Sequence, residues 1–225
     1  AAKYRAARRI WAKQMRSLGA GDPKTETMRF HVQTAGSTLT AQQPLNNVAR
    51  TTIQALAAVL GGTQSLHTNA FDEALGLPTD QSALVALRTQ QILANESGVA
   101  DTADPLAGSY YVEALTDELE TLATDLIDRI EEMGGAVRAI EDGWMQGQIE
   151  DSAYAEARRQ SDGSSVVVGM NKYTLGEEEP IPVLEVDEQL ERDQIARTVR
   201  WREQRDQADV DALLEQVEKT AKSED

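Results

Sequence analysis

The chain has no cysteine among its 225 residues. Disulfides, thiolate metal sites and cysteine nucleophiles are therefore excluded. The sequence also lacks any run of about 18 uncharged apolar residues, the length that a membrane-spanning helix needs. No cationic stretch precedes an apolar segment near the start, as it would in a signal peptide. From these absences we expect a cytoplasmic protein that has no membrane partner.

Basic residues are scarce, with 22 Lys and Arg against 38 Asp and Glu, and the net charge is −16. This excess of negative charge argues against nucleic acid and anionic membranes as partners. Only six of the basic residues are lysines. Because so much like charge repels itself at low salt, we expect a halophilic protein from a salt-rich cytoplasm. An ordinary acidic protein is the alternative.

Short strand patterns alternate with longer helical patterns along the first half of the chain. This alternation is typical of βα units around a parallel sheet. The first helix begins without a capping residue, so we expect the sequence to start inside a longer chain. The expected elements are a helix over 1–18, a strand over 28–35, a helix over 40–60 with a capping box at 40–43, a strand over 63–70, a helix over 79–97 capped by Thr79 and Asp80, helices over 111–133 and 136–160 broken by Gly134, Gly135 and Gly143, and a strand over 165–171.

The composition changes after Tyr173. Residues 174–186 form an acidic linker with prolines, and residues 187–225 are charged and helix-forming with few apolar positions. Such helices bury little apolar surface by themselves, so we expect them to dock on a partner or another domain. A solvated tail is equally compatible with the charge pattern.

One face of both predicted strands is polar. Side chains alternate between the two faces of a strand, so His31 and Gln33 share a face, as do Ser65, His67 and Asn69. The inside of an ordinary β/α barrel is packed with branched aliphatic residues. This pattern therefore predicts a hydrated or ligand-filled interior, with two satisfied core histidines as the alternative.

Four residues, Gln33, Gly36, Asn69 and Glu73, lie at or just after the ends of these strands, which is the functional face of a β/α barrel. Gly36 allows a flat ligand to approach the backbone, or serves only as a turn residue. Glu73 either accepts a hydrogen bond from a ligand hydroxyl or favours a helix N-terminus. The chain has no phosphate loop and no nucleophile elbow, and its two histidines lack metal-ligand spacing, so no metal site is expected.

Several stretches resemble the large, catalytic chain of the methylmalonyl-CoA mutase family. The likeness covers roughly residues 1–185. It is carried by residues 3–12, 29–40, 61–78, 104–111 and 168–173.

This resemblance implies an α/β fold, namely the C-terminal portion of a TIM-type (β/α)8 barrel with its last three strands, followed by a helical C-terminal extension. It implies an isomerase that uses adenosylcobalamin for a radical carbon-skeleton rearrangement, interconverting (R)-methylmalonyl-CoA and succinyl-CoA. The family's barrel holds the CoA arm in its lumen and the corrin across its mouth. The resemblance assigns Gln33, Asn69 and Glu73 to the adenosyl group, Gly36, Gly76 and Leu77 to the corrin, and His31, Ser65 and His67 to the substrate channel.

The sequence also departs from the family. It has no D-x-H-x-x-G cobalamin-ligand motif, so a separate cobalamin-binding subunit or domain is an expected partner. The family's substrate-binding Tyr, Arg and His precede this segment, so no catalytic residue is assigned and the chain alone is expected to be inactive. Leu84 stands where the family commonly has arginine.

The resemblance leaves other functions open. The substrate can be isobutyryl-CoA or ethylmalonyl-CoA, on which related mutases act. A non-catalytic assembly subunit, forming an oligomer with another mutase chain, is a further alternative. An unrelated complete α/β enzyme is disfavoured, because the chain contains no self-contained catalytic motif.

Overall fold

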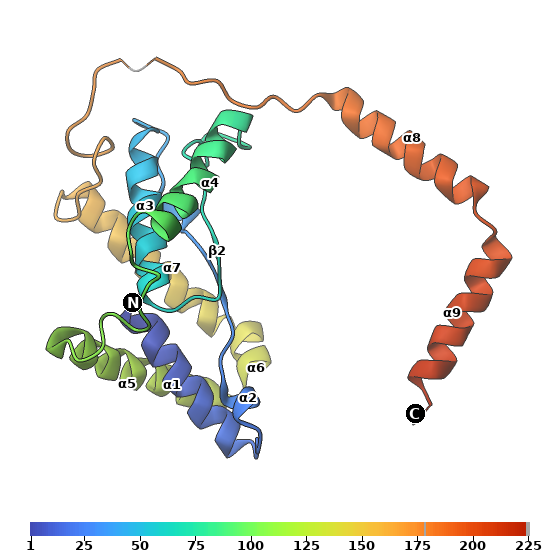
Figure 1. Cartoon of the computed structure of the whole chain (residues 1–225), viewed down its shortest axis with the longest axis horizontal. Coiled ribbons are helices and arrows are strands. Elements are labelled where there is room, and N and C mark those ends of the chain that lie inside the picture. The colour runs from blue at the N-terminus through green and yellow to red at the C-terminus, as the bar shows by residue number, and fades with distance from the viewer. Residues whose placement is uncertain (178, 224–225) are drawn as a thin grey trace. The chain divides into compact units, whose positions relative to one another are not determined.

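The computed structural model describes residues 1–177 and 179–223, and it shows a mostly helical α/β protein with a small parallel sheet (Figure 1). Contacts divide the chain into two units, Ala1–Val183 and Leu184–Asp225. None of the helices in the described ranges is long and apolar enough to cross a membrane. The elements are α1 (Ala2–Ser17), α2 (Pro23–Glu26), β1 (His31–Gln33), the 3₁₀ turn η1 (Gly36–Thr38), α3 (Asn46–Leu60), β2 (Ser65–His67), α4 (Asp80–Asn95), α5 (Tyr110–Glu132), α6 (Ala136–Glu141), α7 (Trp144–Ser161), α8 (Glu188–Gln204) and α9 (Gln207–Ala221).

The sheet is a β1–α3–β2 unit in which the two strands run parallel, as the alternating pattern predicts. His31 pairs with Ser65, and Gln33 pairs with His67. The strands are shorter than expected, although the backbone bond from Thr34 N to His67 O, 3.1 Å long, extends the pairing at one end. The parallel register places the carboxyl ends of both strands side by side.

Helix α1 supports the sheet near the amino ends of the strands. The Tyr4 ring stacks on Phe30 with 5.3 Å between ring centroids. Arg8 Nη1 donates to Gly61 O at 2.5 Å, just before β2. A Cβ added to Gly61 would lie 2.4 Å from Tyr4 Cδ2, so the close approach of α1 requires glycine at this position.

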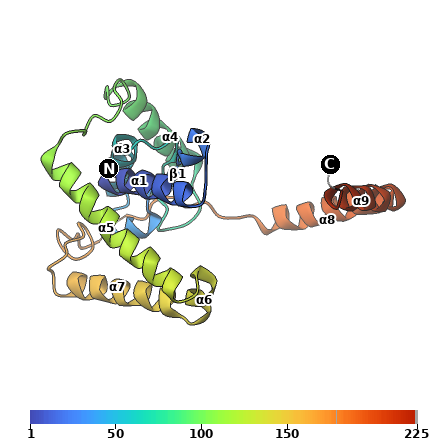
Figure 2. The ribbon, with the colours of Figure 1, turned by 90° about the horizontal axis from the view of Figure 1, so that it is seen from below.

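Helices α1 and α5 pack side by side (Figures 1 and 2) and are joined by ion pairs between basic residues of α1 and acidic residues of α5 and the preceding loop. Glu120, only 7% exposed, accepts from Lys13 Nζ at 2.5 Å and lies 2.8 Å from Arg9 Nε. Exposed pairs of this kind each contribute little, but a buried carboxylate needs its partners. The other pairs are Arg5–Asp104, Arg5–Glu113 and Arg9–Asp117.

The predicted strand over 165–171 is wrong. The segment forms a turn with an isolated bridge between Val168 and Lys172, and it does not join the sheet. The Asn171 side chain accepts from Val167 N and donates to Ser165 O, both at 2.8 Å. Because these bonds satisfy the backbone locally, the β-branched run has no need of a neighbouring strand. In the part of the chain that the structure describes, the sheet therefore contains two of the three expected strands.

The predicted capping box at 40–43 is also wrong. Helix α3 begins at Asn46, after Leu45, which makes no side-chain cap. The Thr40 hydroxyl instead donates to Gln42 O at 2.8 Å, and its amide bonds the Asn47 side chain. The nearby residues Gln42 and Asn47 thus take the hydrogen-bonding groups of Thr40 that a cap would use.

Other predicted helix boundaries are confirmed. Thr79 caps α4 by accepting from Ser82 N at 3.2 Å. Gly134, Gly135 and Gly143 separate α5, α6 and α7, and each adopts positive φ, a conformation that favours glycine.

The second unit contains α8 and α9, which begin at the caps Asp187 and Asp206. Their larger apolar side chains are exposed, Leu213 and Leu214 at 62% each. Docking of these helices on a partner or another domain stays a prediction.

Candidate functional site

Three of the predicted site residues meet where the two strands end. A Cβ added to Gly36, after β1, would lie 3.0 Å from Glu73 Oε1 and 3.2 Å from Asn69 Nδ2, which follow β2. Because Gly36 has no side chain, the Asn69 amide and the Glu73 carboxylate can pack closely against its backbone. A methyl group at this position would press on both side chains.

Asn69 is held rigidly in this cluster. Thr34 Oγ1 donates to Asn69 Oδ1 at 2.8 Å, and the Asn69 backbone N donates back to Thr34 Oγ1 at 2.9 Å. Gln33 Nε2 approaches the same Oδ1 at 3.5 Å. Asn69 is only 2% exposed, yet its Nδ2 has no hydrogen-bond partner within residues 1–177 and 179–223. A buried donor without a partner costs about 1–3 kcal/mol, so this atom fits a site that a ligand acceptor completes.

The polar strand face lies beside this cluster. His31, Gln33, Ser65 and His67 are all exposed on it. His31 Nδ1 and Ser65 Oγ lie 2.7 Å apart across the two strands. The face offers hydrogen-bonding groups along both strands, and its role as a channel stays a prediction.

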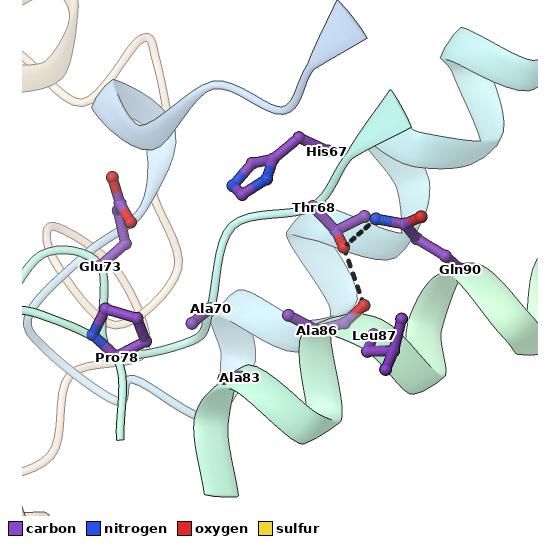
Figure 3. A pocket seen from close by; sticks show the side chains of 9 residues that line it. All are labelled: His67, Thr68, Ala70, Glu73, Pro78, Ala83, Ala86, Leu87 and Gln90. Atoms are coloured by element: carbon purple, nitrogen blue, oxygen red, sulfur yellow. Dashed lines mark hydrogen bonds between the residues drawn. The ribbon is translucent and has the colours of Figure 1, made fainter. Parts of the chain in front are cut away.

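A cavity of about 410 Å³ opens between the end of β2 and helix α4 (Figure 3). Glu73 and His67 line one side, and Ala86 and Leu87 of α4 line the other. Thr68 Oγ1 fixes the helix by donating to Ala86 O at 2.8 Å. A cavity with a largely apolar wall and a few convergent polar groups is typical of a small-molecule site.

The loop after β2 carries the remaining predicted residues. Asp72, 1% exposed, closes this loop: its Oδ2 accepts from Thr79 N at 3.2 Å and its backbone O accepts from Gly76 N at 3.1 Å. Gly76 and the 55%-exposed Leu77 lie on the outside of the closed loop. They present backbone and an apolar side chain to solvent.

Sequence reasoning missed the side chains that hold this site together. Asn47 in the first turn of α3 is completely buried and bonds the loops that follow both strands. Thr34 and Asp72 are equally inaccessible and orient Asn69 and the loop after it. The one available signal was an asparagine pair directly after Leu45, since asparagine is disfavoured inside helices unless its amide is used.

A parallel βα unit with polar side chains grouped after the carboxyl ends of its strands is the arrangement in which α/β proteins place their ligand sites. Comparison with known proteins gives the family. The family described as methylmalonyl-CoA mutase matches residues 1–224. The chain belongs to the methylmalonyl-CoA mutase family, which confirms the resemblance drawn from its motifs.

Individual relatives agree with this placement. The chain is 50% identical to the 2-hydroxyisobutanoyl-CoA mutase large subunit of Aquincola tertiaricarbonis, over 99% of the chain and 40% of the relative. It is 52% identical to the methylmalonyl-CoA mutase of Escherichia coli strain K12, over 95% of the chain and 30% of the relative. It is 45% identical to the mitochondrial methylmalonyl-CoA mutase of Homo sapiens, over 100% of the chain and 30% of the relative. The chain thus spans 30–40% of the length of these relatives.

Proposed function

We propose that this chain is part of the catalytic subunit of an adenosylcobalamin-dependent acyl-CoA mutase, contributing the C-terminal portion of a TIM-type barrel. Membership of the mutase family supports this function. The single observation that carries it in the structure is Asn69 Nδ2, which is buried next to Gly36 and Glu73 and has no hydrogen-bond partner among the described residues.

The donor set fits an adenosyl group. A ribose offers hydroxyl groups that both donate and accept, and a purine offers ring-nitrogen acceptors. Asn69 Nδ2 donates, the Glu73 carboxylate accepts from a hydroxyl, and the Gln33 amide does both. Gly36 allows close approach to the backbone, and the loop with Gly76 and Leu77 lies against the corrin.

Adenosylcobalamin, when bound, supplies the radical chemistry. The chain's own residues bind and orient it. The loop closed by Asp72 and the apolar side of α4 would cover one side of the bound cofactor and exclude water there. The segment has no D-x-H-x-x-G motif, so a cobalamin-binding domain or subunit would supply the histidine that holds cobalamin, and other parts of the mutase would bind the substrate.

The polar face of His31, Ser65 and His67 lines the channel for the CoA arm of the substrate. We propose the interconversion of (R)-methylmalonyl-CoA and succinyl-CoA. The relative named for 2-hydroxyisobutanoyl-CoA favours, as a second candidate, another branched acyl-CoA such as isobutyryl-CoA or ethylmalonyl-CoA.

The test is Glu73→Ala in the complete mutase, with Glu150→Ala on the exposed surface of α7 as the matched control. Losing one hydrogen bond to a charged group should lower turnover by roughly tenfold or more, with CoA-ester affinity unchanged. Steady-state kinetics and CoA-ester titration measure the two quantities. If turnover is equal in Glu73→Ala and Glu150→Ala, Glu73 is not part of the site. If the complete protein has no mutase activity, the role as a non-catalytic assembly subunit is favoured.

A further inference from the structure

Asn47 uses its whole hydrogen-bonding capacity inside the protein. The residue is 0% exposed. Its Nδ2 donates to Thr40 O and to Phe71 O, both at 2.8 Å. Its Oδ1 accepts from Thr40 N at 3.1 Å and from Arg50 Nη1 at 2.6 Å. A primary amide has two N–H donors and one oxygen with two lone pairs, so no capacity is left over.

The two segments that Asn47 joins are the loops that carry the candidate site. Thr40 lies at the end of the loop that starts with Gly36, and Phe71 lies between Asn69 and Glu73. The backbone pairing of the strands stops before these loops, at the bond from Thr34 N to His67 O. Side-chain bonds therefore set the distance between the loops.

Arg50 fixes which way the Asn47 amide points. A guanidinium can only donate, so the atom that faces Arg50 Nη1 must be the amide oxygen. Arg50 Nη2 donates in turn to Val168 O at 2.7 Å, which anchors the guanidinium on the turn around Val168. The amide NH₂ of Asn47 is thereby directed at the two carbonyl groups that it bridges.

The site tolerates little change in the separation of its loops. The Cβ position of Gly36 is 3.0 Å from Glu73 Oε1 and 3.2 Å from Asn69 Nδ2. Hydrogen bonds from N–H groups span a range of only about 0.5 Å, from 2.7 to 3.2 Å. A shift of one loop by that amount would take either Asn69 or Glu73 out of reach of a ligand that also touches Gly36.

We propose that Asn47 is a positioning residue for the adenosyl group. It makes no contact with the cofactor itself and acts by holding Asn69 and Glu73 at a fixed distance from Gly36. This assignment rests on the proposed adenosylcobalamin site.

Asn47→Asp tests the assignment, because it keeps the shape of the side chain and the acceptor for Arg50 but removes both donations. The probes are adenosylcobalamin and hydroxocobalamin, titrated into the complete mutase with its cobalamin-binding domain or subunit. Hydroxocobalamin has the same corrin but no adenosyl group. The preference, defined as the ratio of the adenosylcobalamin affinity to the hydroxocobalamin affinity, should fall about tenfold, which is the equivalent of one hydrogen bond. The affinity for hydroxocobalamin should stay unchanged.

Thr116→Val is the matched control. Thr116 is also 0% exposed, and its hydroxyl donates to Val112 O at 2.7 Å within α5, on an element that does not line the site. This variant should keep the wild-type preference even if its thermal midpoint falls. An equal loss of preference in both variants would identify general destabilisation and overturn the positioning role.

A second variant covers the case in which Asn47→Asp does not fold. Asn47→Ser retains a hydroxyl for Thr40 but is too short to bridge to Phe71, so it should lose the same preference. A folded variant at Asn47 with an unchanged preference overturns the positioning role alone. A wild-type protein that binds neither cobalamin overturns the proposed function, and the role of Asn47 falls with it.

Discussion

Gly36→Ala tests the site most directly, because the structure shows what the added methyl would meet. The new Cβ would lie 3.0 Å from Glu73 Oε1, 3.2 Å from Asn69 Nδ2 and 3.3 Å from Glu73 Cγ. Relaxed contacts to carbon are about 3.5 Å long, so the Glu73 side chain must retreat by roughly 0.5 Å. Asn69 is held by Thr34 and has less freedom to move.

The expected effects on folding and on binding differ in size. Glu73 is exposed, so a changed rotamer costs only about 0.5–1.5 kcal/mol of unfolding free energy. The methyl would displace the Glu73 and Asn69 side chains that contact the cofactor in the proposed site, and overpacking of this kind costs about 1–3 kcal/mol. The affinity for adenosylcobalamin should therefore fall about 5- to 150-fold, while the protein stays folded.

The assay pairs equilibrium titration with adenosylcobalamin and thermal unfolding, both in the complete mutase. Gly21→Ala is the control, because its added methyl meets no atom within 4 Å. It should change neither quantity. If Gly36→Ala binds adenosylcobalamin as tightly as the wild type, the contact of Gly36 with Asn69 and Glu73 is not part of the cofactor site and the reasoning fails.

Three further outcomes concern the fold. Gly61→Ala should lower the midpoint of thermal unfolding, because its Cβ would lie 2.4 Å from Tyr4 Cδ2. The control Gly147→Ala should not lower this midpoint, because its methyl meets no atom of the described residues within 4 Å. Arg159 and neighbouring donors lower the pKa of Glu156 from 4.5 to about 2, so its stabilisation is complete above pH 4.5 and lost as the pH falls through about 2. In an acid titration followed by circular dichroism, Glu156→Gln should lose less unfolding free energy between pH 4.5 and about 2 than the wild type does. Because the net charge is −16, the far-UV circular dichroism spectrum should show a folded protein in molar KCl and lose its helical signal as salt is removed. A spectrum that does not change with salt would contradict halophilic adaptation.

Local signals predicted the helices well. Thr79 precedes α4, and Gly134 and Gly143 interrupt the long helical stretch, so the residues that start and stop these helices lie within them or next to them. Such signals need no knowledge of the rest of the fold. The confirmed boundaries are those whose caps are made by neighbouring residues.

The two wrong predictions have one cause. Thr40 has the residue type of a helix cap, but its amide and carbonyl bond Asn47. The β-branched run around Val167 has the composition of a strand, but Asn171 closes it into a turn. In both places an asparagine amide competes for the backbone, and a sequence pattern does not show which competitor wins.

Part of the candidate site could be predicted and part could not. Alternation along the strands and the rule that function lies at their carboxyl ends grouped Gly36, Asn69 and Glu73 before the structure was known. The buried side chains Asn47 and Asp72 escaped notice, because their importance comes from partners that only the folded chain brings within reach.

The side chains that hold the site loops together are almost entirely uncharged. Thr34, Thr40, Asn47 and Asn69 are joined through amides and hydroxyls, and the charged groups that join this frame are the Arg50 guanidinium and the Asp72 carboxylate. Salt therefore acts mainly on the heavily charged exterior and leaves the neutral bonds of this frame intact. A change of ligand affinity with salt would then report the charges around the site, and not a rearrangement of the loops that present it.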